Sequence, residues 1–369
     1  MVLTSSKSIK RYSASAPGSL MFMGEHAVLN EKKAIVLAID KRIKVTLTPR
    51  TDRTVLIESS LGKIQFPLDA VEENKHTIDL QKRFQFVMGA IEFLKNKLQN
   101  GFELTIVSEF SEQVGLGSSA AVTVATLAVL NAMIHDRMRL INKDNHYNLQ
   151  SQPQLQPQLQ SQSQPDPDQA FLYYLFTEAK TVIKAVQGVG SGADAAASVY
   201  GGAVVYQEKA PSILQRLSHL PPIVVRYSGY KTPTPIVVEE VRARQKQQPK
   251  HYEDLFAAME VCVTDAVPAI EQKDWHRLGK IATVHQELMN AIGVSTPELD
   301  QLVEEMNRTP GILGAKISGS GLGDCVLGIG KPLSGKMPNK IPDKKLDYPE
   351  YKDARDVLVS PSLEGVVYE

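Results

Sequence analysis

The sequence predicts an α+β protein with two domains. A chain of 369 residues is too long for one compact core. Strand-like and helix-like segments are intermixed, without the regular alternation of a parallel α/β fold. Hydrophobic residues make up 43% and charged residues 22% of the chain, as in ordinary globular proteins.

Charge and cysteine content argue against several classes of protein. Lysine plus arginine number 41, as do aspartate plus glutamate, so no basic surface for nucleic acid is indicated. Two cysteines cannot form a disulfide framework, which fits a reducing compartment. The N-terminal residues lack the apolar run of a signal peptide, and the apolar stretch at 120–134 contains polar residues typical of a buried helix. We therefore expect a cytoplasmic protein that binds neither nucleic acid nor membrane.

Hydrophobic periodicity predicts the elements of the first half. Apolar residues recur every three to four positions over 79–98, as in an amphipathic helix. An almost wholly apolar helix is expected after residue 117, and another helix over 168–186. Period-two alternation and turn signals predict the strands 43–49, 54–59, 63–68, 102–110 and 201–207, the second and third as a hairpin.

A low-complexity tract occupies residues 149–167. It consists almost entirely of glutamine, proline, serine and leucine and has little to bury, so we expect an exposed disordered loop. A linker between domains is the alternative. The motifs continue beyond the tract, which favours an insertion within a domain.

The second half begins with a predicted strand at 221–228. A later helix is expected to start with a capping box formed by Ser295 and Glu298. Residues 315–330 predict a strand, a glycine-rich turn and a second strand. The residues beyond Lys331 are rich in proline and charge, and no element is predicted there.

The strongest chemical signal is a glycine-rich loop directly before the apolar helix. Glycines allow consecutive backbone N–H groups to face one anion, and the helix start adds its positive dipole. Serine hydroxyls suit phosphate or magnesium. A tight turn capped by a serine is the alternative, but a rigid helix behind the loop favours ligand binding. The loop residues are Gly115, Leu116, Gly117, Ser118, Ser119 and Ala120.

Two better-known phosphate motifs fit this loop poorly. A Walker motif requires a lysine that does not follow Gly117. The dinucleotide fingerprint is formally present, with Asp136 as its acidic residue. However, the helix leads into the Gln/Pro tract and not into a second parallel strand.

A third glycine turn, 319–323, is followed by Asp324. A hairpin turn explains such a loop when it is taken alone, although three glycines exceed what a hairpin needs. Asp194 follows the glycine-rich stretch 187–192 and is either a helix N-cap or a general base for an attacking hydroxyl.

Three further acidic or basic side chains remain ambiguous. Glu178 lies on a predicted helix, where it is either a magnesium ligand together with Ser119 or part of a solvated face. Glu25 and His26 follow the predicted turn at 16–18 and form either a substrate contact or a structural pair.

Taken together, the segments 16–29, 115–121 and 316–324 resemble the GHMP kinase superfamily, which includes galactokinase, homoserine kinase, mevalonate kinase and phosphomevalonate kinase. The helical region 285–303 is also similar to that family. One such motif is common, whereas the ordered set is specific. The resemblance covers most of residues 12–330.

Within the superfamily, the motifs point to two kinds of enzyme. Residues 24–28, Gly-Glu-His-Ala-Val, are similar to mevalonate kinases, whereas parts of 187–202 and residues 323–325 lean toward phosphomevalonate kinases. The first motif lies against the substrate in that family, so we expect phosphorylation of mevalonate to 5-phosphomevalonate. Phosphomevalonate kinase and a non-catalytic ligand-binding regulator are the alternatives.

The resemblance also implies an architecture and a set of site residues. An N-terminal α/β domain (1–205) and a ferredoxin-like domain (206–330) would enclose the site, followed by a tail (331–369) of unknown role. ATP would lie on the 115–120 loop, Ser119 and Glu178 would hold Mg²⁺, and Asp194 would be catalytic. The partner is a small molecule, and the family allows a homodimer. The acceptor is implied to contact Ser19, Glu25, His26, Gly319, Ser320 and Gly321.

One departure from the family concerns Ser19. Mevalonate kinases usually carry a lysine at this position, where it positions the aspartate and stabilises the transferring group. Lys10 and Lys184 are the candidate substitutes considered from the sequence.

We predict that deleting residues 149–167 leaves turnover within about two-fold of the full chain, because a polar loop contributes little to stability. Steady-state kinetics and a thermal melt of the deletion variant test this. A large loss of folded protein would contradict the insertion hypothesis.

Overall fold

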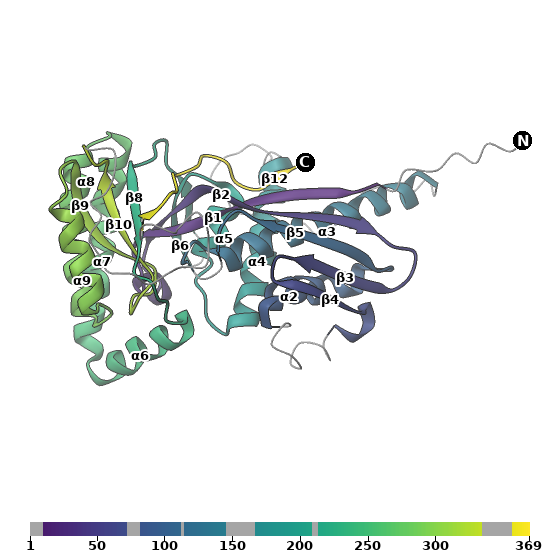
Figure 1. The fold of residues 1–369 in the computed structure, drawn as a ribbon, viewed down its shortest axis with the longest axis horizontal. Coiled ribbons are helices and arrows are strands. Elements are labelled where there is room, and N and C mark those ends of the chain that lie inside the picture. Colours follow the sequence, from purple (N-terminus) through teal and green to yellow (C-terminus); the bar gives the residue numbers. More distant parts are fainter. Residues whose placement is uncertain (1–9, 72–81, 112–113, 145–166, 209–212, 334–355) are drawn as a thin grey trace, which may run out of the picture.

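The computed structural model describes residues 10–71, 82–111, 114–144, 167–208, 213–333 and 356–369. The predicted insertion at 149–167 lies outside these ranges except for its last residue. Figure 1 shows two bodies side by side, each with its own sheet and helices. The predicted α+β class with two domains is confirmed.

The N-terminal domain is built on an eight-stranded sheet. Its main path has the order β12-β1-β2-β5-β3-β4, and β6 pairs with both β2 and β7. The β3–β4 hairpin is formed as predicted, and β3 runs parallel to β5. The strands are β1 (Tyr12–Met23), β2 (Ala34–Pro49), β3 (Thr54–Ser59), β4 (Gly62–Pro67), β5 (Phe102–Ser108), β6 (Ala203–Gln207), β7 (Ile213–Arg216) and β12 (Val367–Tyr368).

Four α-helices cover this sheet in the described part of the domain. Helices α3 and α5 pack on β1 and β2, and α2 and α4 pack against α3. The helices are α2 (Gln85–Leu94), α3 (Ser118–Asp144), α4 (Pro167–Gln187) and α5 (Ala193–Tyr200), with short 3-10 turns η1 (Ala27–Asn30), η2 (Leu68–Ala70) and η4 (Lys95–Lys97).

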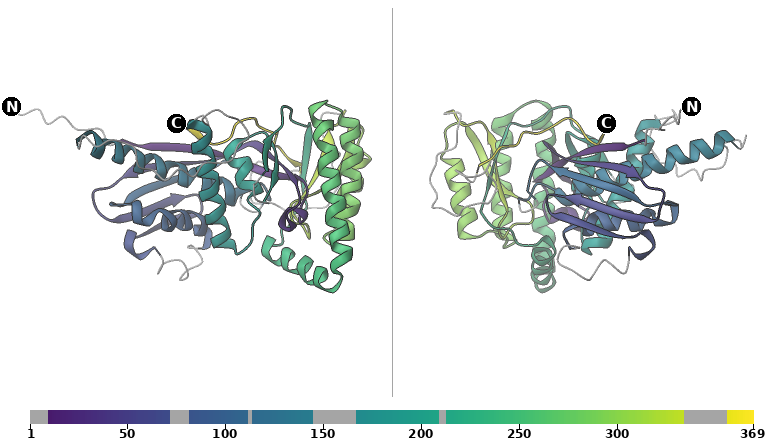
Figure 2. Two further views of the ribbon diagram at one scale, coloured as in Figure 1. Left: turned by 180° about the vertical axis from the view of Figure 1, so that it is seen from behind. Right: turned by 45° about the vertical axis from the view of Figure 1, so that its right-hand side comes forward.

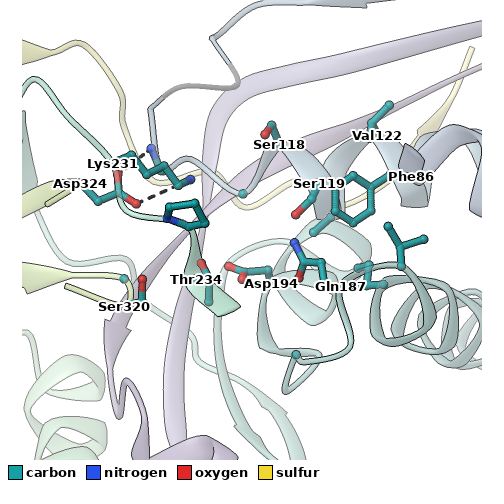
Figure 3. Close-up of a pocket in the computed structure, with 18 of the residues that line it drawn as sticks. Phe86, Ser118, Ser119, Val122, Gln187, Asp194, Lys231, Thr234, Ser320 and Asp324 are labelled. Atoms are coloured by element: carbon teal, nitrogen blue, oxygen red, sulfur yellow. Dashed lines mark hydrogen bonds and ion pairs between the residues drawn. The ribbon is translucent and has the colours of Figure 1, made fainter. Parts of the chain in front are cut away.

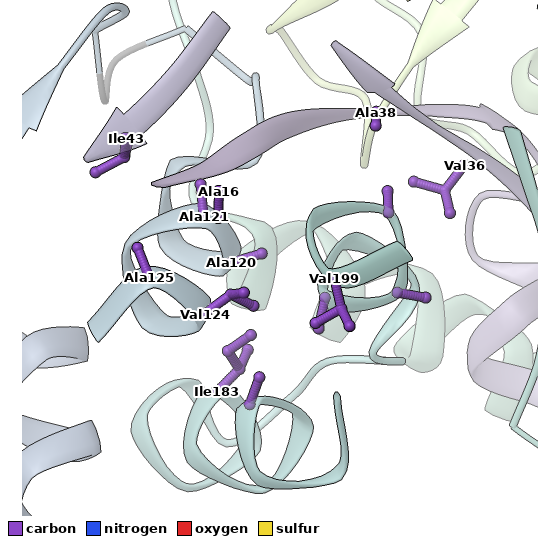
Figure 4. Packing of buried hydrophobic residues seen from close by; sticks show 14 of the residues in the cluster. Ala16, Val36, Ala38, Ile43, Ala120, Ala121, Val124, Ala125, Ile183 and Val199 are labelled. Atoms are coloured by element: carbon purple, nitrogen blue, oxygen red, sulfur yellow. The ribbon is translucent and has the colours of Figure 1, made fainter. Parts of the chain in front are cut away.

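Small side chains bring α3 close to the sheet. Ala120, Ala121 and Ala125 are buried where the helix faces the strands, with Val124 beside them (Figure 4). Close packing of this kind holds the first turn of α3 rigidly. By length and composition α3 could cross a membrane, but 67% of its apolar window is buried inside the protein, as expected for a core helix.

The C-terminal domain contains a four-stranded antiparallel sheet in the order β11-β8-β10-β9. Helices α8 and α9 pack on β9 and β10, and α7 packs on α8, so the helices form an outer layer (Figure 2). The elements are β8 (Ile223–Tyr227), α6 (Thr234–Gln247), α7 (Pro249–Glu271), α8 (Trp275–Ala291), α9 (Pro297–Asn307), β9 (Ile312–Ser318), β10 (Cys325–Gly330) and β11 (Asp356–Val357).

The last residues of the chain contact both domains. β11 extends the C-terminal sheet beside β8, and β12 pairs with β1 at the edge of the N-terminal sheet. Between them, Pro361 forms a bridge with Ile39. The tail, for which the sequence predicted no element, therefore covers an exposed strand edge on each sheet.

Three local predictions are corrected by the structure. Residues 16–18 lie within β1, at a register shift opposite β2, and do not form a free turn. The N-cap of α9 is Thr296, whose hydroxyl accepts the Leu299 N–H, so the capping box at Ser295 is wrong. The expected domain boundary at residue 205 falls inside β6, and we propose that it lies in the connection between β7 and β8.

Candidate active site

A cavity of about 1080 Å³ lies between the two domains. Ligand pockets typically measure about 300–1,000 Å³, so this one has room for a nucleotide and a second small molecule. Its walls include the β1–η1 turn, the start of α3, the end of α4 and the start of α5. The C-terminal domain contributes the segment after β8 and the loop between β9 and β10.

The glycine loop before α3 opens into this cavity. Gly117 has a φ of 68°, and a Cβ there would lie 1.9 Å from Ser19 Oγ. A Cβ on Gly115 would lie 2.0 Å from Asp324 Oδ2. A side chain is therefore excluded at both glycines, and the loop backbone lies directly beside two polar side chains.

Five of the six predicted loop residues line the cavity, and Leu116 does not. The Leu116 side chain is buried in the core, and its carbonyl accepts the Ser19 N–H at 2.9 Å. The residues facing the cavity are Gly115, Gly117, Ser118, Ser119 and Ala120.

Asp194 faces the same cavity from the first turn of α5 (Figure 3). The N-cap of α5 is Gly192, so the alternative role of Asp194 as N-cap is wrong. Its Oδ1 accepts a 2.7 Å hydrogen bond from Ser19 Oγ. Burial raises the pKa of Asp194, an effect that the Ser19 hydrogen bond and the charge of Lys231 oppose.

Ser19 therefore differs from its predicted role. Its side chain is buried behind the glycine loop and contacts Asp194, not the cavity. The hydroxyl fixes the carboxylate from the protein side, which leaves the other oxygen of Asp194 available to the cavity.

The turn between β9 and β10 closes the cavity from the C-terminal domain. Of the three residues of this turn expected to contact the acceptor, Gly319 and Ser320 line the cavity, whereas Gly321 packs against Val294, whose carbonyl would lie 2.5 Å from a Cβ on that glycine. Asp324 also lines the cavity, and its Oδ1 accepts the Gly115 N–H at 2.8 Å. The first and last glycine turns are thus joined by a hydrogen bond between domains.

Glu25 and His26 form contacts between the domains at one wall of the cavity. Glu25 pairs with Lys316 at 2.5 Å, and both side chains are buried, at 2% and 0% exposure. His285 Nε2 lies 3.5 Å from the other oxygen of Glu25 and accepts the Gly24 N–H. Burial raises the pKa of Glu25 and lowers the pKa of Lys316 and of His285, which is therefore neutral.

His26 contributes a second contact at this wall. Its Nε2 lies 2.8 Å from the Ser320 carbonyl, and burial lowers the pKa of the imidazole. A neutral imidazole donates to this carbonyl. Glu25 and His26 therefore each contact the C-terminal domain and do not pair with each other, and both side chains also border the cavity.

Glu178 is placed away from Ser119. Its Oε2 accepts a 2.6 Å hydrogen bond from Asn131 on α3. Asn131 lies about 18 Å further along the helix axis than Ser119, at 1.5 Å per residue. Glu178 is buried and does not border the cavity, so the prediction that it shares a metal ion with Ser119 is wrong.

The substitutes considered for the missing lysine are also wrong. Lys10 is bound to Asp136 outside the cavity, and Lys184 is exposed on α4 without lining it. The structure instead places Lys231 in the cavity wall, beside Asp324. Its only sequence signal is its place between Gly229 and Pro233, directly after a predicted strand.

A second residue that the sequence interpretation missed is Gln187. It lies at the end of α4 and lines the same cavity as Asp194 and Ser119 (Figure 3). Hydroxyl and amide oxygens are ligands that Mg²⁺ accepts, and this ion usually retains waters and binds substrate phosphates. Within the described residues, no group of three or more His, Cys, Asp or Glu side chains could hold a metal. The residues present fit an ion that arrives with a triphosphate.

The parts of this cavity define a class of protein. Backbone N–H groups at a helix start provide an anion site, and a fixed carboxylate beside it can accept a proton from a hydroxyl. Residues of both domains line the space between them. These are the parts of a small-molecule kinase.

Comparison with known proteins identifies the family. The models for the GHMP kinase N-terminal domain and the GHMP kinase C-terminal region match residues 85–147 and 266–336. The chain is 31% identical to a mevalonate kinase of Archaeoglobus fulgidus over 96% of this chain and 99% of that protein. A mevalonate kinase of Pyrococcus furiosus is 28% identical over 86% of this chain and 88% of its own length. The chain belongs to the GHMP kinase family, where these relatives are mevalonate kinases.

A solved structure agrees with the fold. The L. major mevalonate kinase in complex with R-mevalonate superposes with a TM-score of 0.63 at 22% identity, covering 87% of each chain.

We predict that Lys316→Met lowers the free energy of unfolding by about 3–5 kcal/mol, because it leaves the Glu25 carboxylate buried without its partner. Urea unfolding measures the change. Lys250→Met, at a side chain 78% exposed, is the control and should shift stability by less than about 0.5 kcal/mol. Equal stability of the two variants would show that the buried pair contributes nothing.

Proposed function

We propose that the protein transfers the γ-phosphate of ATP to the 5-hydroxyl of mevalonate. The observation that carries this is the 2.7 Å hydrogen bond that holds Asp194 beside the glycine loop in one cavity. The mevalonate kinases among its relatives supply the substrate class.

The triphosphate would bind on the backbone of residues 115–120, at the positive end of α3. The nucleoside would extend toward the apolar side chains Phe86, Ile106, Val122 and Val186, which line that end of the cavity. Mg²⁺ would be held by phosphate oxygens with Ser119 and Gln187, and it would neutralise charge on the phosphates.

The acceptor would occupy the corner between η1, α6 and the β9–β10 turn. Met21, Val28 and Leu29 give this corner an apolar wall, and Ser320 and Thr234 add polar groups. A small hydroxy acid with a branched carbon skeleton fits this mixture. From here its hydroxyl would face Asp194.

The chain's own residues then perform the proton transfer. Asp194 accepts the proton of the hydroxyl while the hydroxyl oxygen forms a bond to the γ-phosphorus. The bond between that phosphorus and the bridging oxygen breaks, and ADP leaves with the electron pair. Ser19 keeps the carboxylate oriented toward the acceptor throughout.

Charge distribution favours mevalonate over 5-phosphomevalonate. Lys82, Arg83 and Lys231 are the lysines and arginines among the described residues that line the cavity. Lys82 and Arg83 are exposed and precede α2, away from the acceptor corner. An acceptor that already carries a phosphate needs more cations than this corner offers.

A cytoplasmic location and a homodimer remain predictions. Both cysteines are free and buried, which supports a reducing compartment.

We predict that a panel of acceptors gives ADP release with mevalonate and little with 5-phosphomevalonate. A coupled assay for ADP measures both rates under the same conditions. Turnover with 5-phosphomevalonate alone would replace mevalonate as the acceptor, and no turnover with any acceptor would support a non-catalytic regulator.

We predict that Asp194→Asn lowers kcat by at least about 100-fold while ATP still binds, because the amide cannot accept the proton. In the wild type the base must be ionised, so kcat/KM should fall as pH is lowered through the raised pKa of Asp194. Unchanged turnover in the variant would remove Asp194 from this role.

A further inference from the structure

We propose that Lys231 is a catalytic residue that binds the γ-phosphate of ATP and stabilises the charge on the phosphoryl group during transfer. This role rests on the proposed kinase function. In this proposal the cation comes from the C-terminal domain. It takes the place of the lysine that is missing from the N-terminal domain, where Ser19 stands.

The position of Lys231 follows from hydrogen bonds on both sides of it. Ser228 donates its N–H to the Asp324 carbonyl, and Asp324 returns its own N–H to the Tyr230 carbonyl, each at 2.8 Å. The Thr232 hydroxyl donates to the Leu322 carbonyl at 2.6 Å. The backbone around Lys231 is therefore fixed to the β9–β10 turn, so its side chain starts from a rigid base.

A short chain of contacts then connects the lysine to the phosphate loop. Lys231 Nζ lies 3.7 Å from Asp324 Oδ2, and Asp324 Oδ1 accepts the Gly115 N–H at 2.8 Å (Figure 3). The ammonium is thus separated from the first N–H of the anion site by a single carboxylate. The positive charge of Lys231 also lowers the pKa of Asp194, against the effect of burial.

The ion pair with Asp324 leaves Lys231 able to bind a further anion. A charge-assisted hydrogen bond measures about 2.7–2.9 Å, so the 3.7 Å contact is a loose one. An ammonium has three N–H donors, and the Lys231 side chain is 31% exposed in the cavity wall whereas Asp324 is 9% exposed. Asp324 therefore positions the ammonium without occupying all of its donors.

During phosphoryl transfer this cation would stabilise negative charge on the transferring group. The transferring group carries its charge on three equatorial oxygens, and catalysis consists mainly of positioning and of stabilising that charge. Two carboxylates, Asp194 and Asp324, face the same space. A phosphate can approach them only if a cation offsets their field, and Lys231 is the cavity lysine that is ion-paired to one of them.

The test compares Lys231→Met with Lys231→Arg and with Lys250→Met, a control at an exposed site on α7. We expect kcat with mevalonate to fall about 100- to 1,000-fold in Lys231→Met, which is typical for the loss of one transition-state donor. The arginine variant should recover part of the rate, and the control should match the wild type. A kcat for Lys231→Met within about three-fold of the wild type would overturn the proposal.

Nucleotide binding supplies a readout that does not depend on turnover. Calorimetry with a non-hydrolysable ATP analogue and with ADP should show that Lys231→Met weakens the analogue about ten-fold and ADP little, because only the analogue carries a γ-phosphate. Equal weakening of both ligands would mean that the lysine does not contact the γ-phosphate, and would overturn the proposal. This result stands even if the wild type uses another acceptor, so it separates this proposal from the one on mevalonate.

A double variant distinguishes catalysis from simple neutralisation of Asp324. If Lys231 serves only to offset that carboxylate, Lys231→Met combined with Asp324→Asn should regain the rate that the methionine variant lost. We expect the double variant to remain at least about 100-fold slower than the wild type, because the γ-phosphate still lacks its cation. Recovery of the rate would overturn the proposal.

Discussion

The backbone of the glycine loop before α3 lies in direct contact with two polar side chains from distant parts of the chain. Ser19 fills the space where Gly117 would carry a Cβ, and Asp324 fills the corresponding space at Gly115. Larger residues at these glycines would separate the loop from both side chains. Since Ser19 holds Asp194 and Asp324 adjoins Lys231, this close approach brings the carboxylate, the anion site and the cation into one cavity.

The same contacts determine how the two domains meet. Asp324 joins the β9–β10 turn to Gly115, and the buried pair of Glu25 and Lys316 joins that turn's first strand to the end of β1. Buried charges of this kind are costly unless each has its partner, so they define one arrangement of the domains and disfavour others. The final residues, paired with a strand of each sheet, restrict the same arrangement from outside.

The electrostatics of the cavity suit a triphosphate that arrives with its own metal ion. Asp194 and Asp324 are both buried enough that their pKa values are raised, and Lys231 is the charge that opposes this at each of them. In the proposed reaction a highly charged anion and its Mg²⁺ would enter this site, one carboxylate would accept the proton, and the other would orient the lysine.

The sequence by itself determined the features that depend on local chemistry. Period-two alternation predicted the β3–β4 hairpin, and the glycine-rich run at 115–117 before an apolar stretch predicted a turn that opens a buried helix, because each signal is contained within a few neighbouring residues. The ordered motifs likewise indicated the kinase family, and within it they marked Asp194 as the candidate general base.

Tertiary structure alone decided the features that depend on distance in space. Glu178 and Ser119 lie on neighbouring helices, and only the packing of α4 on α3 shows that they are far apart along the helix axis. Lys231 is more than 100 residues from Gly115 and carries no motif of its own. It enters the site because β8 and β10 pair, and this pairing places the segment after β8 against the β9–β10 turn. A sequence pattern records which side chains are present, whereas the folded chain decides which of them meet.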